Sequence, residues 1–302
     1  MNNIFLDSKT ANDINKAIDR VHQELDYTDG AIELREVRDL LRLDLQYYQL
    51  NDPGLLGEVI HKLKVGAKQV IARPGLFVEA VRKFDLSALF IPDRKRILVD
   101  DSVPDLKKRW YESHEIAHSL IPWHADYTLG DDRSTLSQGC HERIEAEANY
   151  GGGRLLFPNK VFTDQRLSGA IDLTRVREIA KHFGNTITST LWRCVEQSEG
   201  LMFAAIGEHP RHLREDRPVI EYFVRSPEFA TQFSNITGHD VWTWICSYCT
   251  GKTTGPLGTA EQIVQDVNGT FHFFVIESFS NKHNVLTLAR WIRQAPISVI
   301  IG

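Results

Sequence analysis

The sequence predicts an α+β protein in which helices fill most of the first two-thirds and strands gather toward the C-terminus. Three observations lead to this fold class. Apolar residues recur at helical spacing in several segments between residues 11 and 198. Two short apolar runs lie between residues 89 and 99, and mixed strand and helix patterns follow residue 200. Because helices and strands come in separate runs, we expect an α+β architecture.

The N-terminal part reads as a set of charged helices. Helical patterns cover residues 11–25, 31–49, 54–65 and 76–84. In the second of these, Val37, Leu41 and Leu45 fall on one stripe, which Tyr48 continues. We therefore expect a helical extension over residues 1–80, either packed on the part that follows or acting as a separate regulatory cap.

Two strands are expected next. Residues 89–91 and 96–99 are short apolar runs on either side of Pro92-Asp93-Arg94-Lys95. A polar, proline-containing segment of this length between two apolar runs is typical of a β-hairpin. The sequence therefore predicts a small sheet directly before the next helix.

The most informative run is His114-Glu115-Ile116-Ala117-His118, an H-E-x-x-H sequence. Two histidines four residues apart lie on one face of a helix, so both imidazoles can reach one metal ion. Glu115 projects nearby and can take a proton from a water molecule on that metal. The alternative is a pair of histidines at the edge of the core with ordinary hydrogen bonds. The motif predicts His114 and His118 as metal ligands and Glu115 as the catalytic acid and base.

The helix that carries this motif has recognisable ends. Ser102 is expected as its N-cap with Pro104 in the first turn, and Pro122 stops it. Leu106, Trp110, Ala117 and Ile121 recur at helical spacing, which predicts a stripe facing the core beside the histidines.

A second helix should supply a third ligand. It runs from Ile144 to Phe157 and offers Glu142, Glu145 and Glu147. Glu145 and Asn149 share a face, whereas Glu147 points about 160° away around the helix. We expect Glu145 to be the ligand and Asn149 to be an outer partner for a histidine N–H.

Three consecutive glycines, residues 151–153, interrupt this helix. Each should cost about 1 kcal/mol relative to alanine in a helix interior. The simplest reason for three in a row is close backbone approach to the His114 helix, and a break in the helix is the alternative.

These residues resemble a known family. H-E-I-A-H, followed by I-E-A-E-A-N-Y-G-G-G-R-L-L-F-P, is similar to the ImmA/IrrE bacterial metallopeptidases, whose pattern is H-E-x-x-H, E-x-x-x-N or E-x-x-x-D, and L-L-x-P. Matched by position, His114, His118 and Glu145 correspond to the ligands and Glu115 to the acid and base. The triple glycine departs from the pattern. The resemblance implies a mostly helical, zincin-type, gluzincin-like core with a small sheet over residues 81–200.

The resemblance also implies a function. It indicates a hydrolase, a zinc metalloprotease with one Zn²⁺ per chain, that cleaves a specific protein inside the cell. The protein substrate in such a family is commonly a DNA-binding repressor, in a stress or mobile-element response. Nitrogen and oxygen ligands leave manganese or iron open as well. The alternatives are a non-catalytic regulator that binds protein or DNA with a structural metal site, and hydrolysis of a small amide.

The polar segment 123–143 joins the two helices and must pass near the metal. Tyr127 or His141 could donate to an oxyanion there, although a solvated loop is the simpler reading for each. Cys140 lies close to the second helix, and a free cysteine without a role is the simpler reading for it.

Two helices are expected over residues 171–183 and 186–198, on either side of Gly184-Asn185. They resemble a helix-turn-helix unit at 171–198, but acids offset their arginines and lysines, so a scaffold role is favoured over DNA binding. An α+β sensor-like domain is expected over residues 201–302. Its strands are expected near 201–206, 218–225, 271–277 and 297–301, and its helices near 227–234, 260–266 and 284–292.

Composition limits the classes of protein to which the chain can belong and the compartment in which we expect it. The net charge of −5 argues against a strongly basic nucleic-acid-binding protein. No apolar run approaches 18 residues and no secretory leader is evident, so no membrane association and a cytoplasmic location are expected. Four cysteines do not form a disulfide framework in a chain of 302 residues, and Cys246-Ser247-Tyr248-Cys249 is a lone C-x-x-C.

Overall fold

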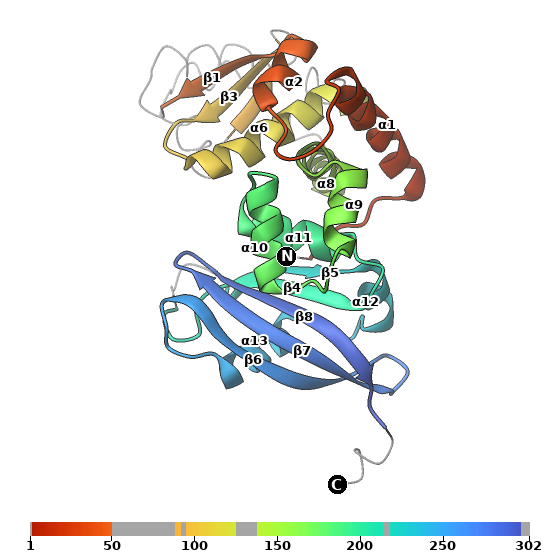
Figure 1. Ribbon diagram of the computed structural model, residues 1–302, viewed down its shortest axis with the longest axis vertical. Coiled ribbons are helices and arrows are strands. Elements are labelled where there is room, and N and C mark those ends of the chain that lie inside the picture. The colour runs from red at the N-terminus through yellow and green to blue at the C-terminus, as the bar shows by residue number, and fades with distance from the viewer. Residues whose placement is uncertain (1, 50–87, 92–94, 125–137, 214–217, 297–302) are drawn as a thin grey trace. The chain divides into compact units, whose positions relative to one another are not determined.

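The computed structural model describes residues 2–49, 88–91, 95–124, 138–213 and 218–296. Helices and strands are both extensive in it, so the predicted α+β class is confirmed (Figure 1). No helix in these ranges is long and apolar enough to cross a membrane.

The chain forms two compact units. The N-terminal unit contains Leu6–Thr163 and His182–Asn185, and the C-terminal unit contains Met1–Phe5, Asp164–Lys181 and Thr186–Gly302. The N-terminal unit contains the H-E-x-x-H helix. Its elements are α1 (Ser8–Glu24), α2 (Leu34–Leu41), β1 (Asp44–Tyr48), β2 (Ala88–Ile91), β3 (Arg96–Asp100), α6 (Asp105–Leu120) and α8 (Gln138–Leu156).

The small sheet of the N-terminal unit has the strand order β1-β3-β2. Strands β2 and β3 pair antiparallel, with Ala88 opposite Val99 and Ile91 opposite Arg96, which confirms the predicted hairpin. Helix α6 packs against β2 and β3. Ile97, Leu98 and Val99 are buried, so the middle strand ties the sheet to the core.

The expected helix over residues 31–49 is wrong in its second half. Helix α2 ends at Leu41, because Arg42 has a left-handed φ of 55°. The chain then forms β1, which pairs parallel with β3 and places Tyr48 opposite Asp100. Pairing with a distant strand outweighs the local helical pattern here. The helices expected over 54–65 and 76–84 lie outside the described residues.

Helix α6 starts later than expected. Pro104 takes the N-cap position, and the Ser102 N–H instead donates to Asp100 Oδ1 at 2.8 Å. The expected core stripe is correct at its C-terminal end, where Ala117 and Ile121 are buried, and wrong at Leu106, which is 57% exposed. The apolar contact of α6 therefore lies beside the histidines.

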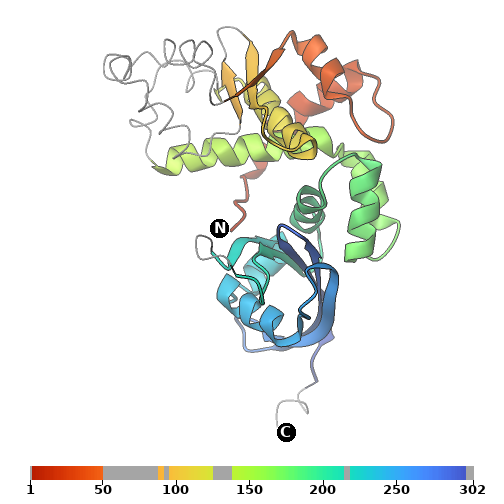
Figure 2. The same ribbon diagram turned by 90° about the vertical axis from the view of Figure 1, so that its left-hand side faces the viewer.

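Helix α8 runs without interruption through the three glycines and packs against α6. A Cβ atom on Gly152 would lie 3.0 Å from the His114 nitrogen and 3.1 Å from its Cα. A Cβ atom on Gly151 would lie 2.9 Å from that of Ala117. For Gly151 and Gly152 the predicted reason, close backbone approach to the His114 helix, is confirmed. Figure 2 shows the two helices side by side.

We expect Gly152→Ala to destabilise the protein by about 1–3 kcal/mol, the usual range for overpacking. At an open helical position the same change would stabilise the helix by about 1 kcal/mol. Urea unfolding measures the effect, with Gly169→Ala as control for space, because Gly169 lies outside the helices and a Cβ atom there would meet no atom within 4 Å. A stabilising Gly152→Ala would contradict the close approach.

Helix α9 (Asn159–Leu167) and helix α10 (Leu173–His182) each have residues in both compact units. With α11 (Ile187–Glu196), α10 confirms the two helices expected around Gly184-Asn185, where Gly184 has a φ of +63°. Phe157, Phe162 and Phe183 form an aromatic cluster in the core of the N-terminal unit.

The C-terminal unit is built on an antiparallel sheet with the order β5-β4-β8-β7-β6. Its further elements are β4 (Met202–Gly207), β5 (Ile220–Arg225), α12 (Pro227–Gln232), α13 (Gly238–Tyr248), β6 (Thr254–Gln265), β7 (Phe271–Asn281) and β8 (Val285–Gln294). A core of phenylalanines, including Phe203, Phe229 and Phe274, lies between this sheet and helices α12 and α13.

Six of the seven expectations for this unit meet a clear outcome. The strands expected near 201–206, 218–225 and 271–277 and the helix near 227–234 are confirmed as β4, β5, β7 and α12. The helices expected near 260–266 and 284–292 are wrong, since these residues belong to β6 and β8. Both strands pair with β7, and this pairing overrides helix-forming residues such as Ala260 and Leu288. The strand near 297–301 lies outside the described residues.

Candidate metal centre

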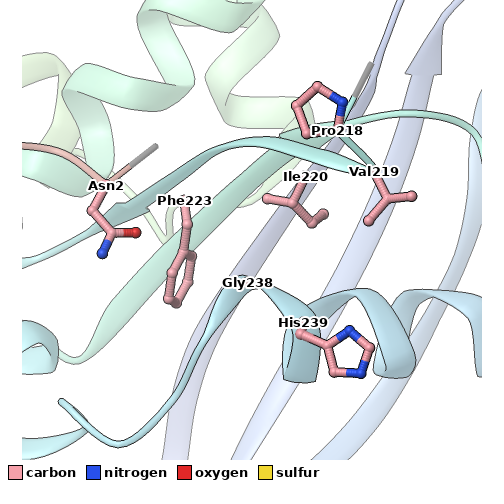
Figure 3. A pocket seen from close by; sticks show the side chains of 7 residues that line it. All are labelled: Asn2, Pro218, Val219, Ile220, Phe223, Gly238 and His239. Atoms are coloured by element: carbon pink, nitrogen blue, oxygen red, sulfur yellow. The ribbon is translucent and has the colours of Figure 1, made fainter. Parts of the chain in front are cut away.

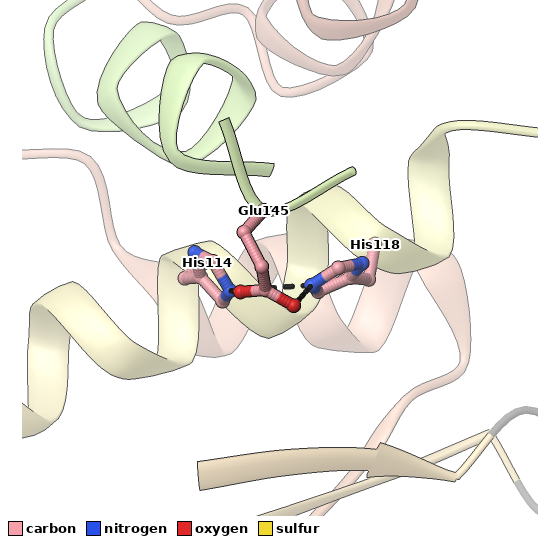
Figure 4. Close-up of side chains that lie close together, drawn as sticks. All are labelled: His114, His118 and Glu145. Carbon is pink, nitrogen blue, oxygen red and sulfur yellow. Dashed lines mark hydrogen bonds and ion pairs between the residues drawn. The ribbon is translucent and has the colours of Figure 1, made fainter. Parts of the chain in front are cut away.

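Three side chains converge where α6 crosses α8. His114 Nε2 lies 3.2 Å from His118 Nε2 and 3.3 Å from Glu145 Oε2. His118 Nε2 lies 4.0 Å from Glu145 Oε1. Figure 4 shows the two imidazoles on α6 with the Glu145 carboxylate between them. Among the described residues this is the one group of three or more His, Cys, Asp or Glu side chains placed to hold a metal ion.

Local structure explains the convergence. Four residues on a helix advance slightly more than one turn, so His114 and His118 present their rings on one side of α6. Glu145 reaches them because Gly151 and Gly152 let α8 approach the backbone of α6 closely. The glycines of one helix thus position the carboxylate next to the histidines of the other.

The cluster is poorly solvated and negatively charged. The His114 and His118 side chains are 12% and 10% exposed, and that of Glu145 is 39% exposed. Burial by itself lowers the pKa of His114, but hydrogen bonding to Glu145 and the charges of Glu115 and Glu145 outweigh it and raise this pKa. A site that draws positive charge onto an imidazole also favours a bound cation.

The donor set fits zinc. Zinc takes histidine nitrogen and carboxylate oxygen at about 2.0–2.2 Å in a tetrahedral arrangement, which separates neighbouring ligand atoms by about 3.3 Å. His114 Nε2 lies 3.2 Å from His118 Nε2 and 3.3 Å from Glu145 Oε2, close to this separation, and His118 Nε2 lies 4.0 Å from the other carboxylate oxygen, Oε1. Three protein ligands leave the fourth position that catalytic zinc sites keep open.

Asn149 lies behind His114. Its Oδ1 is 3.0 Å from His114 Nδ1, so the imidazole can donate Nδ1–H to the amide oxygen and leave Nε2 for a metal. Asn149 stands one helical turn after Glu145 on α8, as the sequence pattern requires. The geometry supports the outer-partner role that we expect for Asn149.

The sequence does not predict the hydrogen-bond partners of His118. His118 Nδ1 lies 2.9 Å from His124 Nδ1, and His124 Nε2 lies 3.1 Å from Glu147 Oε2. Trp123 Nε1 donates to the same Glu147 oxygen at 2.6 Å. The sequence offers one signal for this arrangement, the direction of Glu147, which points away from Glu145 around the helix. Its partner in the polar segment becomes evident only in three dimensions.

Electrostatics differ between the two groups behind His118. Burial lowers the pKa of His124 although Glu147 opposes this effect, so the ring is neutral at pH 7. Burial raises the pKa of Glu147, but hydrogen bonds from Trp123, His124 and Arg143 outweigh burial and lower it. An ionised carboxylate therefore faces a neutral imidazole.

Glu115 is 7% exposed and lies between the two histidines in sequence. Burial raises the pKa of Tyr48 to about 12, with the charges of Asp100 and Glu115 adding to the shift. Tyr48 on β1 therefore carries a neutral hydroxyl that interacts electrostatically with Glu115. The sequence does not predict this neighbour, because its pattern favours one helix over residues 31–49. Of the other predicted donors, Tyr127 lies outside the described residues. His141 lies in α8, but its side chain is not described.

The lone C-x-x-C has none of the properties of a reactive pair. Cys246 is exposed on α13 and Cys249 is buried at its end, and both are free. Burial raises the pKa of both thiols, with the neighbouring Cys246 adding to the shift at Cys249. Neither cysteine is therefore activated as a thiolate.

Two arginines of α10 and α11 are engaged within the protein. Arg193 is 3% exposed and donates to Glu196 at 2.7 Å. Arg175 bonds to Glu178 and to Ser168. These contacts occupy two of the guanidinium groups that a nucleic-acid interface would need.

A second hollow lies in the C-terminal unit. It has a volume of about 230 Å³ and lies between β5, α13 and the N-terminal residues (Figure 3). Its lining residues are Asn2, Pro218, Val219, Ile220, Phe223, Gly238 and His239. Among these described lining residues only His239 is titratable, so they offer no set of catalytic groups.

The fold and the cluster define a class of protein, one in which a small sheet lies beside a helix with two histidines and a second helix adds a glutamate, so that the three side chains could hold a metal ion. Residues 67–194 match the family model described as the IrrE N-terminal-like domain, a peptidase family. This segment contains His114, His118 and Glu145, and its match to the family model confirms the resemblance to the ImmA/IrrE family.

A solved structure that is similar over most of this chain is a regulator of transcription by its name. A Mycobacterium tuberculosis transcriptional regulator is 15% identical to this chain, with a TM-score of 0.52 over 94% of this chain and 90% of the other. At this identity the likeness shows the fold alone. No curated protein matches the chain.

Proposed function

We propose that the protein is a zinc-dependent endopeptidase that cleaves a specific protein inside the cell. The observation that carries this proposal is the convergence of two imidazole nitrogens and one carboxylate oxygen within 4.8 Å of one another. The cluster lies inside the segment that matches a peptidase family. In this proposal His114, His118 and Glu145 hold one zinc ion and Glu115 is the catalytic residue.

The chemistry divides between the ion and the protein. A zinc ion in such a site lowers the pKa of water and polarises a carbonyl group. Glu115, buried beside the ligands, would accept a proton from the attacking water and later give it to the departing amine. Asn149 would hold the His114 ring with Nε2 toward the metal. The neutral hydroxyl of Tyr48 would be a hydrogen-bond donor for the developing oxyanion.

An extended protein substrate has a place to pair beside α6. In the part of the chain that the structure describes, β2 pairs with β3 alone, and α6 packs against both strands. The outer edge of β2 would give main-chain hydrogen bonds to an extended peptide. This edge favours a protein substrate over a small amide.

The substrate class comes from the family. We infer that the cleaved protein is a DNA-binding repressor and that cleavage starts a stress or mobile-element response in the cytoplasm. Support comes from the match to the peptidase family and from the resemblance in fold to a protein named a transcriptional regulator.

The domain assignment is part of the same proposal. Residues 81–200 would form a zincin-type core with helix-turn-helix-like helices at 171–198, and residues 201–302 a sensor-like domain that could use the 230 Å³ hollow. Residues 1–80 would be the helical extension. Helix α1 and strand β1 lie in the same compact unit as the metal cluster, which supports an extension packed on the peptidase instead of a separate cap.

A second function has one observation in its favour. The structural neighbour is named a transcriptional regulator, so a non-catalytic regulator with a structural metal site is the other candidate. Such a protein would have no need of a carboxylate at position 115, whereas Glu115 and all three ligands are present here.

The experiment compares protein N-termini in cells that make the wild type with those in cells that make Glu115→Gln. The peptidase proposal predicts one or a few new N-termini that depend on Glu115. If regulation proceeded equally with both forms and no new N-terminus appeared, the second candidate would take its place.

A further inference from the structure

We propose that Glu147, acting through His124, sets the tautomer of His118 and so keeps the Nε2 lone pair of His118 turned into the cluster. Both residues are then positioning residues, because neither touches the metal ligand atoms themselves. The inference rests on the proposed function, since it gives the cluster a metal ion to bind.

The three side chains form a continuous chain of hydrogen bonds. Glu147 Oε2 lies 3.1 Å from His124 Nε2, and His124 Nδ1 lies 2.9 Å from His118 Nδ1. On the other side of its ring, His118 Nε2 lies 3.2 Å from His114 Nε2. The chain therefore ends on the nitrogen that faces the cluster.

The direction of each hydrogen bond follows from the groups at the Glu147 end. The indole nitrogen of Trp123 donates to Oε2 at 2.6 Å, and Nε of Arg143 donates to Oε1 at 3.0 Å. Neither donor can accept a hydrogen bond. Both carboxylate oxygens are thus held as acceptors, and His124 must present Nε2–H to Glu147.

The tautomer of His124 fixes that of His118. A neutral imidazole carries one N–H, so Nδ1 of His124 is an acceptor when its proton is on Nε2. His118 can approach this nitrogen at 2.9 Å only by donating its own Nδ1–H. The proton of His118 is then on Nδ1, and Nε2 is available as a ligand.

Burial makes this control effective. The side chain of His124 is fully buried and that of Glu147 is 4% exposed, so water does not compete for either hydrogen bond. Glu145 and Glu147 stand two residues apart on α8. One carboxylate lies in the cluster, and the other supports a histidine ligand of the same cluster from behind.

The first test is the tautomeric state of the metal-free wild type at neutral pH, by two-bond ¹H–¹⁵N NMR on protein labelled in its 12 histidines. We expect Nε2–H on His124 and Nδ1–H on His118. The His124→Gln variant assigns the His124 signal. A proton on Nδ1 of His124 would overturn the proposal without reference to metal or activity.

The second test is Glu147→Met, which removes both acceptor oxygens and keeps the length of the side chain. His124 Nε2–H then loses the Glu147 acceptor, so the proton of the ring is no longer held on Nε2 and can move to Nδ1, which faces His118. We expect zinc affinity, measured by chelator competition, to fall about 10–100-fold. Glu24→Met, the same change at an exposed position of α1, should leave it unchanged.

The outcomes separate this inference from the proposed function. Unchanged tautomers and unchanged zinc affinity in Glu147→Met would overturn the inference while the peptidase proposal stood. No zinc binding by the wild type would overturn the peptidase proposal, and the tautomers of the metal-free protein would still decide the role of Glu147. If Glu147→Met fails to fold, the wild-type tautomers alone decide it.

Discussion

The Glu115→Gln variant should lose peptide cleavage by about 10²–10⁴-fold, the usual contribution of a positioned acid and base. The glutamine has the same shape but cannot accept a proton. Glu115 is 7% exposed and is not one of the three clustered ligands, so the variant should bind zinc as the wild type does. Cleavage rates on the natural substrate and zinc content, measured on the same preparations, test both parts.

A matched control is Glu142→Gln, which removes a carboxylate at an exposed position of α8. We expect it to cleave within a few-fold of the wild type. Wild-type cleavage by Glu115→Gln would remove Glu115 from the mechanism. Loss of zinc in Glu115→Gln would mean that its effect on rate has a structural origin.

The Arg38→Met variant should destabilise the protein by about 3–5 kcal/mol, the range for breaking a buried ion pair at one partner. Arg38 Nε donates to Glu112 Oε1 at 2.6 Å, and the two side chains are 19% and 10% exposed. Glu112 stands two residues before His114 on α6, so the ion pair links α6 to α2. Without Arg38 the Glu112 carboxylate would be a buried charge that has lost its cation.

The destabilisation should increase with pH. Burial raises the pKa of Glu112 above 4.5, and Arg38 opposes this shift. A raised carboxyl pKa contributes stability below pH 4.5 that is lost as the pH rises through the folded-state pKa. Removing Arg38 raises this pKa further, so Arg38→Met should lose more stability at pH 8 than at pH 5.

Urea unfolding at the two pH values measures this effect. Arg35→Met on the same helix is the control, because Arg35 is 83% exposed and lies 3.9 Å from an exposed Asp39. Its effect should stay within about 0.5 kcal/mol. Equal effects of the two variants would show that the buried pair does not hold α6.

The metal cluster is largely predictable from the sequence because its geometry is local. The spacing of His114 and His118 sets their common face, and the spacing of Glu145 and Asn149 sets theirs. The glycines at 151 and 152 indicate how closely the two helices pack. The structure agrees, because a Cβ atom added at either position would lie within 3.0 Å of an atom of α6. Each of these inferences needs only the period of a helix.

The remaining parts depend on partners far away in the chain. Strand β1 pairs with residues 96–100, and no local pattern near Leu45 reveals that pairing. Strands β6 and β8 flank β7 and contain helix-forming residues, so their local pattern is misleading. His124 and Glu147 come into contact only because the residues directly after α6 lie beside α8.

The most direct measurement is the metal content, by mass spectrometry, of protein purified without affinity metals, for the wild type and Glu145→Ala. The side chain of Glu145 is 39% exposed and supplies one of the three clustered ligand atoms, so the variant should remain folded. We expect about one zinc per chain in the wild type and its loss in the variant. No metal in either protein would contradict the peptidase mechanism.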